Sequence, residues 1–109
     1  MAGVYSTRLV IAQSVGFTPT NLHTCVDGKV TYLRTIACVT GRNLLVAWWY
    51  LALGSGGPKF AAANHTELTN DFTLDLYNGE WVFQPGEELW FASDGSEWDV
   101  CLSGYELTP

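Results

Sequence analysis

Residues 77–107 read YNGEWVFQPGEELWFASDGSEWDVCLSGYEL, and this stretch decides the fold. Three short turn signals divide it into aromatic and aliphatic runs. Two of them suit tight hairpin turns, whose central residues need positive φ, and the third suits a type II turn with proline before glycine. In that order, the signals are Asn78-Gly79, Asp94-Gly95 and Pro85-Gly86. We therefore predict that residues 77–107 form an antiparallel meander, against which the rest of the chain packs.

The last run alternates between apolar and polar residues. Trp98, Val100 and Leu102 fall on one face of an extended chain, and Asp99, Cys101 and Ser103 fall on the other. Phe72, Leu74 and Leu76 alternate in the same way with Thr73, Asp75 and Tyr77. A period of two residues is that of a strand with one buried face. Both segments are therefore predicted to be strands.

Four earlier segments are also predicted to be strands, because β-branched and aromatic residues are enriched in them. They are residues 4–13, 22–26, 30–40 and 44–53. The last is almost wholly apolar, which favours a strand covered on both faces. Its length also fits a buried helix, but its cluster of aromatic residues and the glycines that flank it favour a strand.

Turns separate these segments at short intervals. Asp27-Gly28 is a turn, and residues 54–58, GSGGP, are predicted to be a flexible connector and a long loop. Residues 59–70 fit either a helical turn or a loop that crosses from one sheet to the other. About eight short strands predict a single all-β domain over residues 1–109. Its architecture is a two-sheet antiparallel β-sandwich, of which the jelly roll is one form.

Aromatic residues are the strongest chemical signal in the chain, with five each of Trp, Tyr and Phe in 109 residues. A domain of this size buries only about two-thirds of its unfolded surface, so we expect some rings at the surface. Exposed Trp and Tyr anchor subunit interfaces or stack on sugar rings, and a dense aromatic core is the alternative. Adjacent side chains point to opposite faces of a strand, so one of Trp48 and Trp49 faces outward or into a partner. The residues predicted at an interface are Trp48, Trp49, Tyr50, Trp90, Trp98 and Tyr105.

Charge is unevenly distributed along the chain, whose net charge is −6. All five basic residues lie within residues 1–60 with Asp27 as the only acid, whereas residues 61–109 carry ten acids and no base. This polarity suits ion pairs between the two halves or head-to-tail contacts between copies. Strands of both halves that interleave in the sheets would instead remove it. An acidic chain repels phosphate, so we expect no nucleic-acid partner.

The cysteine count is odd, and the three residues are Cys25, Cys38 and Cys101. The start of the chain lacks a basic segment followed by an apolar run, so we expect no signal peptide. Free, buried thiols are then the expectation, and the cysteine spacing fits no zinc site. The longest apolar run, residues 44–53, is too short to span a bilayer, so no membrane association is predicted.

The sequence contains no catalytic motif, and we predict neither an enzyme nor a cofactor. His23 and His65 are isolated. Carboxylate pairs occur at Glu87/Glu88, Glu97/Asp99 and Asp71/Asp75. Glu97 and Asp99 share one face of a strand, where they could bind a cation or do acid–base work. A small hydrolase that uses Glu97/Asp99 or Glu87/Glu88 is a further hypothesis. The alternative is a solvated edge that discourages aggregation.

Several turn and strand patterns resemble those of small β-sandwich virion proteins of long-tailed bacteriophages that infect actinobacteria. Members of that family show a turn and Lys before an "RDI" strand, a "WVLNAGDTL" turn and a final "VSGVE" strand. The matching segments here are residues 26–36, 81–89 and 102–106. This chain departs from the pattern at Asp27, where proline is common, at Thr35 in place of Asp, and in its aromatic central strand.

The resemblance implies a structural role without catalytic residues. The chain would be a minor tail protein or a capsid decoration component, made in the host cytoplasm and incorporated into the virion. Its partners would be copies of itself, with a trimer as the expected homo-oligomer, and other virion proteins. A second hypothesis, from the exposed aromatic residues expected beside Asp, Asn and Glu, is a carbohydrate-binding module that recognises a host surface glycan.

Overall fold

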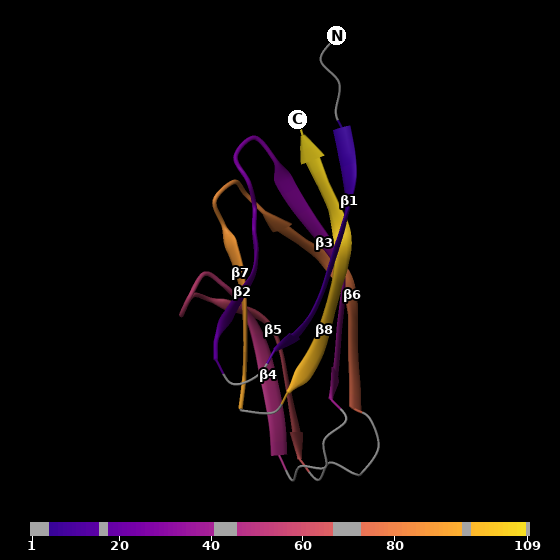
Figure 1. Cartoon of the computed structure of the whole chain (residues 1–109), viewed down its shortest axis with the longest axis vertical. Helices are drawn as coiled ribbons and strands as arrows, with labels where there is room; N and C mark the ends of the chain where they lie inside the picture. Colours follow the sequence, from indigo (N-terminus) through magenta and orange to yellow (C-terminus); the bar gives the residue numbers. More distant parts are fainter. Residues whose placement is uncertain (1–4, 16–17, 41–45, 67–72, 95–96, 109) are drawn as a thin grey trace.

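The computed structural model describes residues 5–15, 18–40, 46–66, 73–94 and 97–108. These residues form eight β-strands. The strands are β1 (Tyr5–Val15), β2 (Thr20–Thr24), β3 (Val30–Thr40), β4 (Val46–Leu53), β5 (Lys59–Thr66), β6 (Thr73–Phe83), β7 (Glu88–Ser93) and β8 (Trp98–Thr108). They lie in two sheets, which form the two layers visible in Figure 1. The predicted all-β, two-sheet antiparallel sandwich is confirmed.

The strand order is that of a jelly roll. Sheet A has the order β1-β8-β3-β6, and sheet B has the order β2-β7-β4-β5. Each strand of the first half pairs antiparallel with its mirror partner in the second half: β1 with β8, β2 with β7, β3 with β6 and β4 with β5. The chain is therefore one long antiparallel ribbon, wrapped so that successive pairs fall in alternate sheets.

This wrapping places strands of the basic half beside strands of the acidic half in both sheets. The interleaving expected as one outcome of the charge polarity is therefore observed. β1 and β3 flank β8, whereas β2 and β4 flank β7.

The predicted meander of residues 77–107 is wrong. β6, β7 and β8 follow one another in sequence, but no two of them are neighbours in a sheet. Asn78-Gly79 is no hairpin turn either, because β6 continues through it. At this point the register between β3 and β6 shifts, and the Nε of Arg34 donates a hydrogen bond of 3.1 Å to the carbonyl of Gly79. Glycine here marks a β-bulge, which locally breaks a ladder without ending the strand.

Two other turn signals give the predicted turns. Gly28 and Gly86 both have positive φ, and the amide of Glu87 donates to the carbonyl of Gln84 over 3.0 Å, which closes the Pro85-Gly86 turn. This turn passes from sheet A to sheet B and forms no hairpin. Gly95, of the Asp94-Gly95 signal, lies outside the described residues.

The connector of residues 54–58 has the predicted bounds, but it is a hydrogen-bonded turn and not a long loop. It joins the paired strands β4 and β5, and the amide of Leu53 donates to the carbonyl of Pro58 over 2.8 Å. Residues 59–66 form β5, so the predicted helical turn or crossing loop is wrong there; residues 67–70 lie outside the described ranges. Ala61 and Ala63 lie beside Leu51 and Trp49 of β4, and such small side chains leave room for their larger neighbours.

The core lies between the sheets and is built around two tryptophans. Trp49 of β4 and Trp98 of β8 are almost fully buried, with ring centroids 6.4 Å apart and planes at 63°. Phe91 of β7 packs parallel to Trp49 at 6.0 Å. Edge-to-face and offset contacts of this kind add to the stabilisation from burial. The alternation predicted for residues 98–103 is confirmed, since Val100 and Leu102 are buried with Trp98.

Gly104 of β8 gives a test of the packing between β8 and β3. A Cβ atom at Gly104 would lie 1.9 Å from the carbonyl oxygen of Tyr32, so the backbone of β3 would have to move. We expect Gly104→Ala to lower the free energy of unfolding by more than about 2 kcal/mol, as measured by urea denaturation. Gly79→Ala is the control, because its Cβ would meet only the ring of Trp81, at 3.1 Å. Equal losses in the two variants would contradict this packing.

Candidate functional site

The six residues predicted at an interface lie in three different parts of the sandwich. Trp48, Tyr50 and Trp90 project from the outer face of sheet B, Tyr105 projects from the outer face of sheet A, and Trp49 and Trp98 lie in the core. The core position corrects the prediction for Trp49 and Trp98, which are only 1% and 0% exposed. Alternation along β4 places Trp49 inward and therefore Trp48 outward, as expected.

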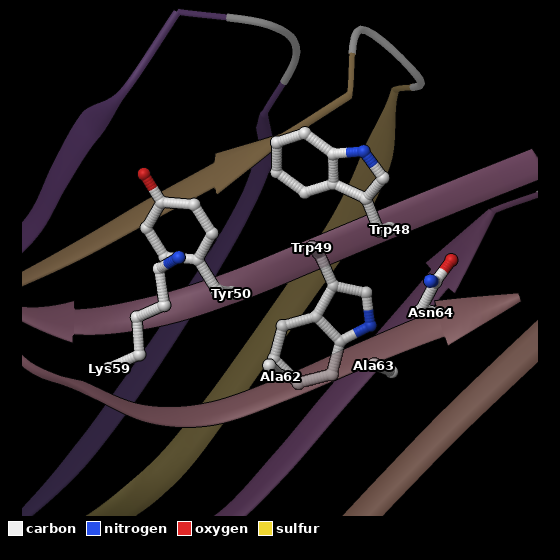
Figure 2. Close-up of a pocket in the computed structure, with 7 residues that line it drawn as sticks. All are labelled: Trp48, Trp49, Tyr50, Lys59, Ala62, Ala63 and Asn64. Carbon is white, nitrogen blue, oxygen red and sulfur yellow. The ribbon is translucent and has the colours of Figure 1, made fainter.

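The outer face of sheet B carries two neighbouring aromatic rings, Trp48 and Tyr50, which we call the aromatic pair. Their ring centroids are 5.9 Å apart and their planes differ by 8°. Figure 2 shows the two rings side by side with their faces toward the viewer, and Trp49 on the other side of β4. Trp48 is 37% exposed and Tyr50 is half-buried. The pair therefore presents two neighbouring rings whose planes are nearly parallel.

Small and polar residues surround the aromatic pair. Ala62 of β5 and Ala92 of β7 are the register partners of Tyr50, and Asn64 of β5 is the partner of Trp48. The ammonium group of Lys59 lies over the Tyr50 ring, 4.4 Å from its centroid. With the aromatic pair, these β5 residues line an open hollow of about 430 Å³. The small side chains of Ala62 and Ala92 leave space beside the rings, and the hydrogen-bonding groups of Asn64 and Lys59 lie at the two ends of the pair.

The outer face of sheet A is aliphatic at one end. Val10, Leu74 and Leu76 are 51%, 58% and 55% exposed. They flank smaller residues of β1, β3 and β8 that line a shallow hollow of about 360 Å³. We call this surface the aliphatic patch, and its members are Val10, Ala12, Ala37, Val39, Leu74, Leu76 and Cys101. Exposed aliphatic residues gathered in this way usually mark a contact surface.

The aliphatic patch was not anticipated, because β6 turns its leucines outward and its polar residues inward. The inward Asp75 accepts a hydrogen bond of 2.7 Å from Nε1 of Trp49, and its carboxylate lies 2.8 Å from Nε2 of His65. A tryptophan N–H inside the core needs an acceptor, and Asp75 provides it. The sequence signal was therefore the acid within an alternating strand, but its partner on β4 could be identified only from the fold.

Burial and Asp75 together change the acidity of two nearby groups. Cys38 is the register partner of Asp75, and burial, followed by the charge of Asp75, raises the pKa of its thiol. Partial burial, the charge of Asp75 and the Cys38 thiol raise the pKa of Tyr77. Both groups are therefore held in their neutral forms, and Cys38 is a poor nucleophile here.

The two histidines connect the sheets at opposite edges. His23 of β2 lies 3.6 Å from the carboxylate of Glu106 and 3.2 Å from the hydroxyl of Thr31, and His65 contacts Asp75. Because β2 and β5 are the two edges of sheet B, the histidines do not meet. Each His–carboxylate contact is therefore part of the packing between the sheets.

The carboxylate pairs serve local structure. Glu87 accepts a hydrogen bond of 2.6 Å from the amide of Gln84, and Glu88 accepts from Asn21 and Trp90. Asp99 accepts from the hydroxyl of Ser14. Asp71, of the pair Asp71/Asp75, lies outside the described residues. Within the described ranges, no three His, Cys, Asp or Glu side chains are placed to hold a metal ion.

The three cysteines are free, as expected. Cys25 and Cys38 are buried, whereas Cys101 is exposed in the aliphatic patch, so the expectation of burial was wrong for Cys101.

In the part of the chain that the structure describes, no helix is long and apolar enough to cross a membrane. No family model, curated protein or solved structure matches the chain.

The two buried tryptophans give a matched test of the Asp75 contact. Nε1 of Trp49 is bonded to Asp75, whereas Nε1 of Trp98 is buried and has no hydrogen-bond partner among the described residues. Both changes to Phe remove similar volume, but only Trp49→Phe breaks a hydrogen bond to a carboxylate. We expect Trp49→Phe to lower the free energy of unfolding by about 2 kcal/mol more than Trp98→Phe. Urea denaturation at neutral pH measures both, and an equal or larger loss for Trp98→Phe would contradict the role of Asp75.

Proposed function

We propose that the chain is a structural component of a bacteriophage virion, a minor tail or capsid decoration protein, that acts through subunit–subunit contacts. The turn and strand patterns of residues 26–36, 81–89 and 102–106 support the virion role by resemblance. The aliphatic patch on sheet A is the observation that carries the contact role. Exposure of Leu74 and Leu76 to water is unfavourable in free energy for a lone subunit. Covering these side chains in an assembly removes that surface from water and stabilises the assembly.

We propose a second copy of the chain as the partner that covers the patch. Leucine side chains at one side of the patch project outward, and small residues beside them line a hollow. A raised edge next to a hollow on one face suits contact between copies, since the edge of one copy can enter the hollow of the next.

Charge supports the same partner. The chain carries a net charge of −6, so copies repel one another wherever their acidic surfaces meet. Asp99 is the only carboxylate among the described residues that line the hollow, no Lys or Arg lies there, and Asp99 already accepts a hydrogen bond from Ser14. Contact through the patch therefore brings few like charges together. The homo-oligomer expected from the resemblance, a trimer, forms through this face in the proposal.

A charge placed in the patch tests the contact. We expect Leu74→Asp and Leu76→Asp each to shift the protein from an oligomer to a monomer, because a contact would bury the new carboxylate. Light scattering coupled to size exclusion measures the mass. Val26→Asp is the control, since Val26 is 49% exposed but lies between β2 and β3, away from the patch. A wild-type monomer at all accessible concentrations, or an oligomer unaffected by both leucine changes, would contradict the proposal.

Cys101 reports on the same face without a change of sequence. In a free subunit its exposed thiol reacts with a soluble thiol reagent, whereas Cys25 and Cys38 are buried and do not react without unfolding. Assembly through the patch covers Cys101. Its labelling is therefore slow in the wild-type oligomer and fast in Leu76→Asp.

Particles provide the test of the virion role. We expect the wild-type chain to be a stoichiometric component of purified phage particles, detected by mass spectrometry and by the density lost from images when the chain is absent. Leu76→Asp is expected to reduce its incorporation, and Val26→Asp is expected to leave it unchanged. Particles that never contain the wild-type chain would remove the virion role, even if the isolated protein self-associates.

A further inference from the structure

We propose that the aromatic pair on the outer face of sheet B binds a glycan: an extended chain of equatorially linked pyranose sugars. This site is separate from the aliphatic patch, because it lies on the other sheet of the sandwich. It goes beyond the assembly role, which does not use it.

The geometry of the rings supports this ligand. Aromatic faces carry negative charge density, and the axial C–H groups of a pyranose ring carry partial positive charge, so a sugar stacks flat on such a face. Trp48 and Tyr50 offer two faces whose planes differ by 8° and whose centroids lie 5.9 Å apart. This separation is comparable with the advance per sugar along an extended β-1,4-linked chain. Parallel ring faces at this spacing suit two successive sugars, with one sugar against each ring.

The surroundings of the pair fit the edges of such a chain. Asn64, beside Trp48, has an amide that can donate to and accept from hydroxyl groups. The exposed Lys59 ammonium lies over Tyr50 and must move from the ring before a sugar stacks there. An exposed cation–π contact is worth only about 0.5–1 kcal/mol, and the displaced ammonium can then donate to a sugar hydroxyl. Ala62 and Ala92 place no bulky side chain beside Tyr50.

Other ligands with flat faces fit less well. Nucleobases also stack on aromatic side chains, but their phosphates are repelled by a chain of net charge −6. A protein partner would cover Trp48 with apolar side chains. The polar groups at both ends of the pair, together with its open and shallow hollow, favour a hydroxyl-rich ligand instead.

Titration with neutral oligosaccharides tests the proposal. We would add cellohexaose and, separately, chitohexaose to the purified protein, and follow binding by tryptophan fluorescence and isothermal titration calorimetry. We expect saturable binding of at least one of them, and a loss of about tenfold or more in affinity in Trp48→Ala and in Tyr50→Ala. Tyr105→Ala is the control, because Tyr105 lies on the outer face of sheet A, away from the aromatic pair. This change removes one ring from that face, and the neighbouring ring of Tyr32 remains.

The outcomes distinguish the site from the alternatives. No heat and no fluorescence change with either oligosaccharide at millimolar concentration would overturn the proposal, and so would binding that is equal in Trp48→Ala and wild type. If Trp48→Ala instead lowers the mass of the oligomer, the aromatic pair is a subunit contact and the glycan site is rejected. The assembly role through the aliphatic patch does not depend on any of these results.

Discussion

The structure depends on the pairing of each strand with its mirror partner along the chain. Only β4 and β5 are joined by a short turn, so the other three pairs close long loops before their hydrogen bonds form. This pairing also decides which side chains are buried. It places β4 between β7 and β5, so that Trp49 enters the core and Trp48 faces outward. Both outer surfaces that carry the proposals follow from that arrangement.

Local signals predicted the strands better than their partners. Alternation in residues 98–103 identified the buried face of β8, and the bounds of β3 were predicted correctly as residues 30–40. The meander failed because a turn signal reports local backbone preference and says nothing about which sheet the next strand joins. Gly79 shows this limit clearly, since glycine suits a hairpin and a β-bulge equally well. Residues 59–66 were missed because their alanines lack the β-branched and aromatic residues typical of strands.

The candidate surfaces could be predicted only in part for a related reason. Adjacent tryptophans at positions 48 and 49 were enough to place one ring outside, and alternation along β4 then placed Tyr50 beside it. The aliphatic patch could be identified only from the structure, because Leu74 and Leu76 look like core residues in the sequence. Their exposure follows from Asp75, which turns inward to accept the Trp49 N–H and to meet His65. A buried hydrogen bond across the sheets has thereby decided which face of β6 meets solvent.

The same inter-sheet contact explains how one small domain can support two separate surfaces. Asp75 draws the polar side of β6 into the sandwich, which leaves the outer face of sheet A aliphatic near its β6 edge. Trp49, bonded to Asp75, anchors β4 from the inside while its neighbour Trp48 lies on the outer face of sheet B. The patch and the aromatic pair therefore point away from each other on opposite layers. A copy bound at the patch would leave the aromatic pair uncovered, so the proposed assembly and the proposed glycan binding use different faces.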